Sequence, residues 1–130
     1  FGPILDAEGK KAYRGGLYPT ADSVRACFQF GNGLPGAGSW CFVAHESAKE
    51  DRIDIVGDKG SLSFSVFTYQ PIVLQNENGR QEFAVENPPY VQLPLIKLVV
   101  EHLQDKAICT CDCVSATPVN WVVDRILGKL

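Results

Sequence analysis

The sequence predicts an α+β fold, with an open, mainly antiparallel sheet of about six or more strands and two late helices packed on one face. Two observations carry this prediction. Short runs in which apolar and polar residues alternate fill the first two-thirds of the 130-residue chain, whereas the last third places apolar residues at helical spacing. Glycine, asparagine and aspartate separate the alternating runs by only a few residues, which is typical of neighbouring antiparallel strands. We therefore expect one domain over residues 1–130.

Alternation is clearest in residues 23–30 and 61–67. In the second run Leu62, Phe64 and Val66 point to one side, and the intervening serines point to the other. The full set of predicted strands is 23–30, 39–45, 52–56, 61–67, 71–75 and 80–85, and the last two flank a hairpin turn at 76–79.

Two amphipathic helices are predicted near the C-terminus. Apolar residues recur every three or four positions from Leu95 to Leu103, and Pro94 suits the first turn of that helix. The second helix is expected to begin with Thr117 as its N-cap and to end at Gly128. The sheet face left uncovered is suited to docking a partner domain or a second copy, because its residues are small and mildly polar: Cys27, Cys41, Ser61, Ser63 and Ser65.

Composition excludes several classes of protein. Twelve basic residues are scattered among fifteen acidic ones, for a net charge of −3, so nothing resembles the basic footprint of a nucleic-acid-binding protein. No apolar run approaches the ~18 residues of a membrane span, and the N-terminus lacks the features of a signal peptide. Five cysteines, an odd number, favour a reducing compartment and hence the cytoplasm. Because the chain contains no methionine, we expect it to be processed or cut from a longer protein.

Residues 31–36 read Gly-Asn-Gly-Leu-Pro-Gly, which matches the glycine pattern of a dinucleotide-binding turn. That turn must open a helix whose N-terminus meets the pyrophosphate. Here residues 37–44 alternate like a strand, and Pro35 disfavours a helical conformation at Leu34. We therefore interpret the segment as a glycine-rich hairpin loop and assign no cofactor-binding residue.

Cysteines 109, 111 and 113 form a second pattern with possible chemistry. Structural zinc sites usually space their cysteines two residues apart, and no histidine follows at ligand spacing. The favoured interpretation is an extended segment with cysteines as small apolar residues, so no metal ligand is assigned. A metal-binding domain remains an alternative that a metal assay would test.

Four segments follow an order and spacing found in a known family. They are Asp22-Ser23-Val24 with Phe28 to Gly33, the strand–turn–strand Ile53 to Leu62, the loop Pro88 to Gln92, and the closing helix Trp121 to Leu127. Together they cover most of residues 20–130. On these segments the chain resembles the C-terminal domain of the glucose–fructose oxidoreductase / inositol dehydrogenase / MocA (Gfo/Idh/MocA) family.

The resemblance implies a two-domain enzyme that transfers a hydride between a nicotinamide and a sugar- or polyol-like alcohol. An N-terminal Rossmann domain would hold NAD or NADP. The C-terminal open sheet, similar to those of dihydrodipicolinate reductase and glyceraldehyde-3-phosphate dehydrogenase, would enclose the substrate and build a homodimer through its open face. The family's Glu-Lys-Pro segment and its glycine-rich motif with Asp and His would precede Phe1. No catalytic residue is therefore assigned, and the isolated chain is expected to be inactive.

Four residues are candidates for contacting the substrate. Tyr13, Arg14 and Tyr18 lie in an early loop, although ordinary solvation of that loop is the favoured explanation for them. His45, at the predicted end of a strand, is the one histidine retained as a candidate. The alternative function is a stand-alone binding or scaffold module that dimerises through its sheet without catalysis.

Overall fold

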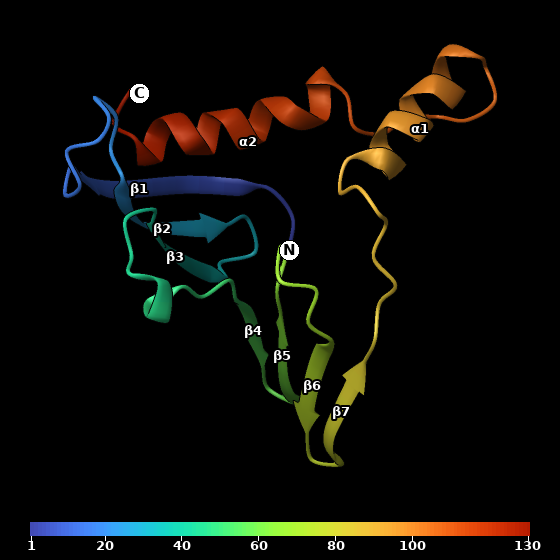
Figure 1. Ribbon diagram of the computed structural model, residues 1–130, viewed down its shortest axis with the longest axis horizontal. Helices are drawn as coiled ribbons and strands as arrows, with labels where there is room; N and C mark the ends of the chain where they lie inside the picture. The colour runs from blue at the N-terminus through green and yellow to red at the C-terminus, as the bar shows by residue number, and fades with distance from the viewer. The chain divides into compact units, whose positions relative to one another are not determined.

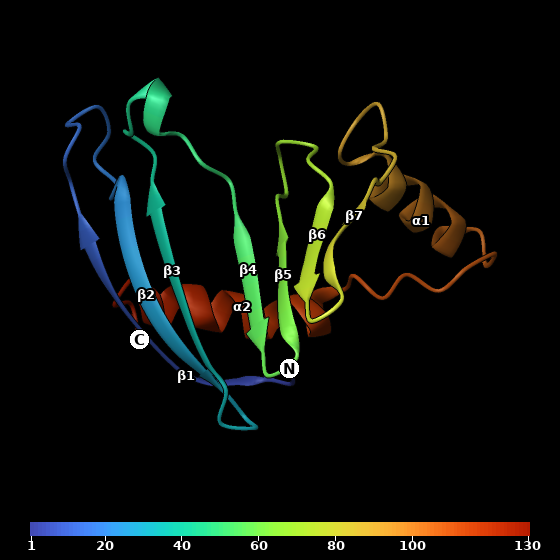
Figure 2. The same cartoon turned by 90° about the horizontal axis from the view of Figure 1, so that it is seen from below.

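The computed structural model describes residues 1–130, which divide into two compact units. The first unit joins Phe1–Glu46 to Cys109–Leu130, and the second unit is Ser47–Ile108. Sheet A, in the first unit, contains the antiparallel strands β1 (Ile4–Ala12), β2 (Ser23–Phe30) and β3 (Pro35–Cys41) in that order. Sheet B, in the second unit, contains β4 (Ile53–Gly57), β5 (Gly60–Phe64), β6 (Ile72–Asn76) and β7 (Gly79–Phe83) (Figures 1 and 2).

The α+β class is confirmed, since seven antiparallel strands precede the helices α1 (Leu93–Leu103) and α2 (Cys113–Ile126). The strands form two sheets rather than one continuous ladder, because β3 pairs only with β2 and β4 pairs only with β5. Residues 42–52 between them form a turn and the short 3₁₀ helix η1 (Glu46–Ala48). No helix of the structure combines the length and apolar character needed to cross a membrane.

The Gly31–Gly36 segment forms the hairpin between β2 and β3, as the sequence predicts. The N–H of Phe30 donates a hydrogen bond to the carbonyl of Leu34, and the N–H of Gly33 donates one to the carbonyl of Phe30, both at 2.9 Å. Gly33 adopts a left-handed conformation with a φ of +86°, which favours glycine. Gly36 lies opposite Phe28, and a Cβ atom at Gly36 would collide with the Phe28 ring. The strand therefore starts at Pro35, earlier than predicted, because its glycines leave room for aromatic rings. It ends at Cys41, so the predicted strand over 39–45 is wrong beyond that residue.

The core of the first unit lies between α2 and the adjacent face of sheet A. Ala7, Ala26 and Ile126 are its buried residues, with partly buried apolar side chains around them. α2 packs along β1, as Figure 1 shows, and Gly9 makes the close approach possible. A Cβ atom at Gly9 would meet both the carbonyl oxygen and the Cγ2 atom of Ile126. The small side chains of β1 and β2 therefore set how closely α2 lies on the sheet.

The start of α2 differs from the prediction, since its N-cap is Asp112 rather than Thr117. The Asp112 carboxylate accepts from Ser115 N–H at 2.9 Å, and the Ser115 hydroxyl accepts from Asp112 N–H at 3.0 Å. This reciprocal capping box stabilises an additional turn, and Pro118 consequently lies inside the helix. Cys113 is thus the first helical residue and not part of an extended cysteine run. The predicted end is confirmed, because Gly128 has a φ of +64° and closes a Schellman motif.

Replacing Asp112 by alanine is expected to lower the midpoint of thermal unfolding by a few degrees, because both bonds of the capping box are lost. The backbone N–H of Ser115, followed by its hydroxyl, lowers the pKa of Asp112. The contribution of the cap to folding stability is therefore complete above the ordinary aspartate pKa. It is lost as the pH falls through the lowered pKa of Asp112 in the folded chain. Circular dichroism during heating at neutral pH measures the effect. Glu86→Ala, in an exposed loop, is the matched control, and equal midpoints for the two variants would contradict the cap.

The second unit contains no buried residue. The helix α1 carries the predicted apolar stripe and has Pro94 in its first turn. It makes no extensive contact with a strand, however. Packing of a helix on a sheet therefore occurs for α2 only. The stripe is 38% to 78% exposed and consists of Leu93, Leu95, Ile96, Val99, Val100 and Leu103. Every side chain of sheet B and of the α1 stripe is therefore at least partly exposed.

Candidate functional site

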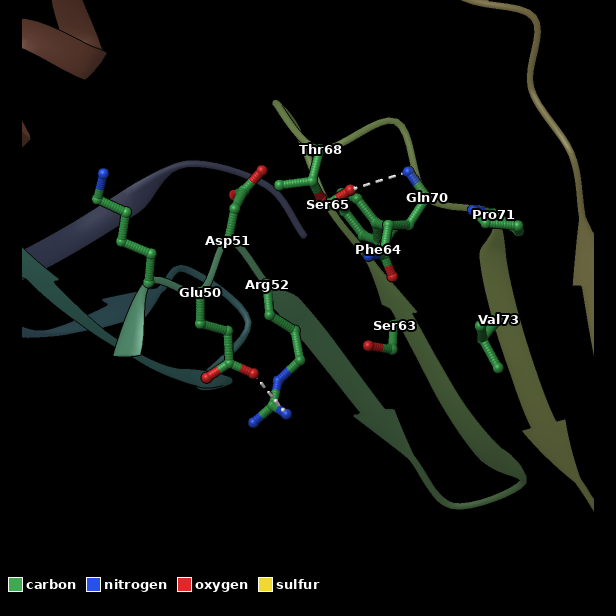
Figure 3. Close-up of a pocket in the computed structure, with 11 residues that line it drawn as sticks. Glu50, Asp51, Arg52, Ser63, Phe64, Ser65, Thr68, Gln70, Pro71 and Val73 are labelled. Atoms are coloured by element: carbon green, nitrogen blue, oxygen red, sulfur yellow. Dashed lines mark hydrogen bonds and ion pairs between the residues drawn. The ribbon is translucent and has the colours of Figure 1, made fainter. Parts of the chain in front are cut away.

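A hollow of about 260 Å³ lies in the second unit, where β5 ends and β6 begins. Its wall comes from the charged segment before β4, from the end of β5, and from the loop that leads into β6 (Figure 3). The lining residues are Lys49, Glu50, Asp51, Arg52, Ser63, Phe64, Ser65, Thr68, Gln70, Pro71 and Val73. We refer to this site as the sheet-B hollow.

Asp51 shapes the sheet-B hollow. Its Oδ2 atom accepts hydrogen bonds from the backbone N–H groups of Val66, at 2.8 Å, and Phe67. The Ser65 hydroxyl accepts from Gln70 N–H at 3.4 Å, drawn as a dashed line in Figure 3. Asp51 and Ser65 thus fix the β5–β6 loop, in which Tyr69 adopts a left-handed conformation with a φ of +54°.

Arg52 links the two acidic neighbours at the mouth of the hollow. Its Nη1 atom lies 3.0 Å from Glu50 Oε1, and its Nε atom lies 2.9 Å from Asp54 Oδ2. All three side chains are about half exposed, so each pair contributes only about 0–1 kcal/mol to stability. The pairs hold the guanidinium in one orientation beside the hollow.

The lining of the sheet-B hollow suits a ligand with several hydroxyl groups. Ser63, Ser65 and Thr68 supply hydroxyls, which both donate and accept hydrogen bonds, and Gln70 supplies an amide. Phe64 adds an apolar surface for C–H groups. No histidine, cysteine or tyrosine lines the hollow, and no group of three or more His, Cys, Asp and Glu side chains is arranged to hold a metal. The arrangement can bind and orient a ligand.

No family model matches the sequence. Oxidoreductase P35 of Formosa agariphila is 33% identical over 100 residues, which is 76% of this chain and 30% of that protein. This chain therefore spans less than a third of the curated relative that it matches.

Solved structures match almost the whole chain. UDP-N-acetylglucosamine 3-dehydrogenase GnnA from Acidithiobacillus ferrooxidans aligns with a TM-score of 0.81 and 12% identity, over 99% of this chain and 41% of that one. Biliverdin reductase from Synechocystis, solved with biliverdin and NADP⁺, aligns with a TM-score of 0.78 and 17% identity, over 98% and 40%. The WlbA dehydrogenase from Bordetella pertussis, solved with NADH and UDP-GlcNAcA, aligns with a TM-score of 0.67 and 15% identity, over 98% and 38%.

This chain has the fold of the C-terminal domain of Gfo/Idh/MocA-type oxidoreductases. The resemblance expected from the sequence is thereby confirmed at the level of fold. The segments that carried it have structural roles here: Asp22 directly precedes β2 and bonds to Ala12 at the end of β1, and the Ile53–Leu62 segment forms the β4–β5 hairpin.

Asp22 organises the loop that carries three of the predicted substrate contacts. Its side chain accepts from the N–H groups of Arg14, at 2.9 Å, and Gly15, at 2.7 Å, and from the Ser23 hydroxyl at 3.1 Å. Asp22 is only 9% exposed, and the Gly15 bond, followed by the Arg14 bond, lowers the pKa of its carboxyl group. The sequence indicates Asp22 only as part of a family-like segment, whereas in the structure it anchors the β1–β2 connection.

The predicted substrate contacts lie outside the sheet-B hollow. Tyr13 and Tyr18 are 60% and 72% exposed in the β1–β2 connection, and the backbone of Arg14 is fixed by Asp22. His45 is exposed in the segment after β3. Neither set lines the hollow of the second unit, so contact with a substrate stays a prediction for all four.

Sequence reasoning missed the residues of the sheet-B hollow. The one available signal is the run Lys49-Glu50-Asp51-Arg52, in which four charged residues directly precede a strand. That run does not reveal that Asp51 caps a loop fifteen residues later. Thr68 and Gln70 become lining residues only because the predicted strand 61–67 ends at Phe64 and the chain turns.

Proposed function

We propose that this chain is the C-terminal domain of an NAD(P)-dependent oxidoreductase, in which it encloses a sugar- or polyol-like substrate and mediates self-association. The observation that carries the proposal is the fold match over nearly the whole chain to enzymes solved with a nicotinamide dinucleotide. Identity of 33% to Oxidoreductase P35 supports it.

The cofactor would be held outside this chain. The Gly31–Gly36 segment turns between two strands and opens no helix, so it lacks the helix N-terminus that holds a pyrophosphate in a dinucleotide-binding turn. A Rossmann domain would supply that site. In hydride transfer the alcohol carbon gives a hydride to the nicotinamide and the hydroxyl gives its proton to a base, so that a carbonyl and NAD(P)H are formed. We assign the base to the domain that this chain would accompany.

The contribution of this chain would be enclosure. The sheet-B hollow offers hydroxyl, amide and charged groups to a polyhydroxylated ligand, and Arg52 is already held by its two carboxylates. The open faces of sheet B and the stripe of α1 leave apolar area that a Rossmann domain and a second copy would cover. A homodimer through the open sheet face is part of this proposal.

Light scattering of the 14.2 kDa chain, with NADH titrated into the same sample, tests the proposal. We expect a dimer, together with no enhancement of reduced-nicotinamide fluorescence, because enhancement requires burial of the nicotinamide ring. Saturable enhancement would overturn the proposal, since the chain would then hold the cofactor itself. A monomer without enhancement would overturn self-association and leave enclosure to be tested in the two-domain protein.

Enclosure is tested by Gln70→Ala in a protein that joins this chain to a Rossmann domain of the same fold family. We expect KM for the sugar or polyol to rise while KM for the nicotinamide is unchanged. Gln81→Ala, on β7 and outside the hollow, is the matched control. Equal kinetic constants for the two variants would remove the sheet-B hollow from the proposal.

A further inference from the structure

A second hollow, of about 310 Å³, lies in the first unit, on sheet A, and has a lining of a different character. No aspartate or glutamate lines it. In a chain of net charge −3, four of the twelve basic residues are gathered here. The lining residues are Lys10, Lys11, Ala12, Arg14, Ser23, Val24, Arg25, Ser39, Trp40 and Cys41. We call this site the basic hollow.

The strand register places like charges side by side in the basic hollow. Lys10 on β1 lies directly opposite Arg25 on β2, and Arg25 lies opposite Ser39 on β3. Directly opposed residues share one face of the sheet, with Cβ atoms about 4.5–5.5 Å apart, and like charges so placed are destabilising. Ala7 and Ala26 pack against α2, so strand alternation puts Lys10 and Arg25 on the other face.

The next row of the same face supplies a hydroxyl group and a thiol. Ser23 lies between Ala12 and Cys41, and its hydroxyl is 3.7 Å from the Cys41 sulfur. Arg14 follows β1 by two residues, and its backbone is fixed by the Asp22 carboxylate. The lining of the basic hollow therefore includes the guanidinium groups of Arg14 and Arg25, the ammonium group of Lys10 and the hydroxyls of Ser23 and Ser39.

No carboxylate forms an ion pair with these cations. The side chains of Lys10, Arg14 and Arg25 form no ion pair or hydrogen bond, whereas Lys11 donates from Nζ to the Leu127 carbonyl at 2.7 Å. The nearby carboxylate of Asp22 is occupied by two backbone N–H groups and the Ser23 hydroxyl.

Glu8, two residues before Lys10 on the same face, lies opposite Cys27 and pairs with no cation. Lys10, Arg14 and Arg25 therefore form no ion pair within the chain.

We propose that the basic hollow binds an oxyanion of the phosphate type that carries at least two negative charges. The two guanidinium forks match the oxygen atoms of such a group, and the ammonium of Lys10 adds a point charge. The Ser23 and Ser39 hydroxyls complete the donor set. Binding removes the repulsion between Lys10 and Arg25, so the anion stabilises the fold as well as occupying the site. This site goes beyond the proposed function and does not depend on it.

Calorimetric titration of the 130-residue chain with inorganic pyrophosphate tests the site. We expect saturable binding of pyrophosphate that weakens as salt is added. Lys10→Gln and Arg25→Gln are each expected to raise the dissociation constant for pyrophosphate about tenfold, because each loses a charge-assisted hydrogen bond. Arg80→Gln is the matched control, because Arg80 is paired with Glu82 on sheet B. Absence of saturable binding, or equal weakening by Arg25→Gln and Arg80→Gln, would overturn the proposal.

Thermal unfolding gives a second readout that separates binding from a folding defect. Without anion, Lys10→Gln is expected to unfold at a higher temperature than the original chain, because one member of the like-charged pair is gone. Pyrophosphate is expected to raise the midpoint of the original chain, and the same concentration is expected to raise that of Lys10→Gln by a smaller amount. A lower midpoint for Lys10→Gln without anion would contradict the repulsion on which the site rests.

The source of the phosphate group is distinguished by two further probes. If glucose 6-phosphate binds more tightly than inorganic phosphate, the site is assigned to a phosphorylated small molecule. If inorganic phosphate binds more tightly, the site is assigned to the free anion. Glucose itself is the uncharged control and should not bind here. A different result would overturn the proposal: pyrophosphate binds neither the original chain nor Arg25→Gln, and Arg25→Gln changes the oligomeric state. The basic hollow would then contact an acidic surface of a partner.

Discussion

Replacing Gly9 by alanine is expected to destabilise the first unit by about 1–3 kcal/mol, the usual cost of inserting a methyl group into a packed interface. A Cβ atom at Gly9 would meet the backbone carbonyl of Ile126 and lie 2.7 Å from its Cγ2 atom. A side chain could rotate away, but the backbone carbonyl moves only if α2 moves. Ile126 belongs to the three-residue core of this unit, so the shift also exposes that core.

Urea unfolding monitored by circular dichroism at 222 nm measures the Gly9→Ala effect, because α2 is the helix of this unit. Gly31→Ala is the matched control in the same unit, since a Cβ atom there has no neighbour closer than 3.6 Å. If Gly9→Ala unfolds at the same urea concentration as Gly31→Ala, then α2 does not rest on β1 as closely as the structure indicates.

Regular alternation and helix-end signals account for what the sequence predicts of this fold. The predicted strand 23–30 coincides with β2, because apolar and polar residues alternate without interruption along it. β1 has no such signal: Gly9 and two lysines interrupt it, and only Ala7 is buried. Gly128 marks the end of α2 because a left-handed residue leaves few alternatives to glycine.

Competing local signals explain the misplaced start of α2. Thr117-Pro118 and Asp112 with Ser115 both match the start of a helix. The capping box prevails because it satisfies two backbone groups at once, whereas the Thr117 hydroxyl instead donates to the carbonyl of Cys113 at 2.6 Å. Choosing between such signals needs the hydrogen-bond geometry, which the sequence alone does not supply.

Neither hollow could be predicted, because each depends on residues brought together by register. The sheet-B hollow needs Asp51 to meet the N–H groups of Val66 and Phe67, which lie fifteen and sixteen residues later in the chain. The basic hollow needs Lys10 and Arg25 to fall on the same face, and a slip of one residue in the β1–β2 register would separate them. Scattered basic residues in the sequence thus become a cluster only through strand pairing.

Replacing Asp22 by asparagine is expected to release the β1–β2 connection. The carboxylate accepts hydrogen bonds from two backbone N–H groups and one hydroxyl. An asparagine side chain has only one acceptor oxygen, and its NH₂ group would face N–H groups that are themselves donors. We expect trypsin to cleave the Arg14–Gly15 bond about tenfold faster, because local opening of the connection becomes easier. Asp58→Asn, in the exposed β4–β5 turn, is the matched control and should leave that rate unchanged.

The same anchor predicts a pH dependence with a definite sign. The N–H groups of Gly15 and then Arg14 lower the pKa of Asp22, so the folded chain holds the carboxylate in its charged form at a pH where the unfolded chain is already protonated. The anchoring is therefore complete above the ordinary aspartate pKa of about 3.9 and is lost as the pH falls through the lowered folded value. The amide chemical shift of Gly15 should follow this titration in the original chain and should be flat in Asp22→Asn. A Gly15 amide that titrates equally in both chains would show that another group holds the connection, and Arg14 would then lose its fixed place beside the basic hollow.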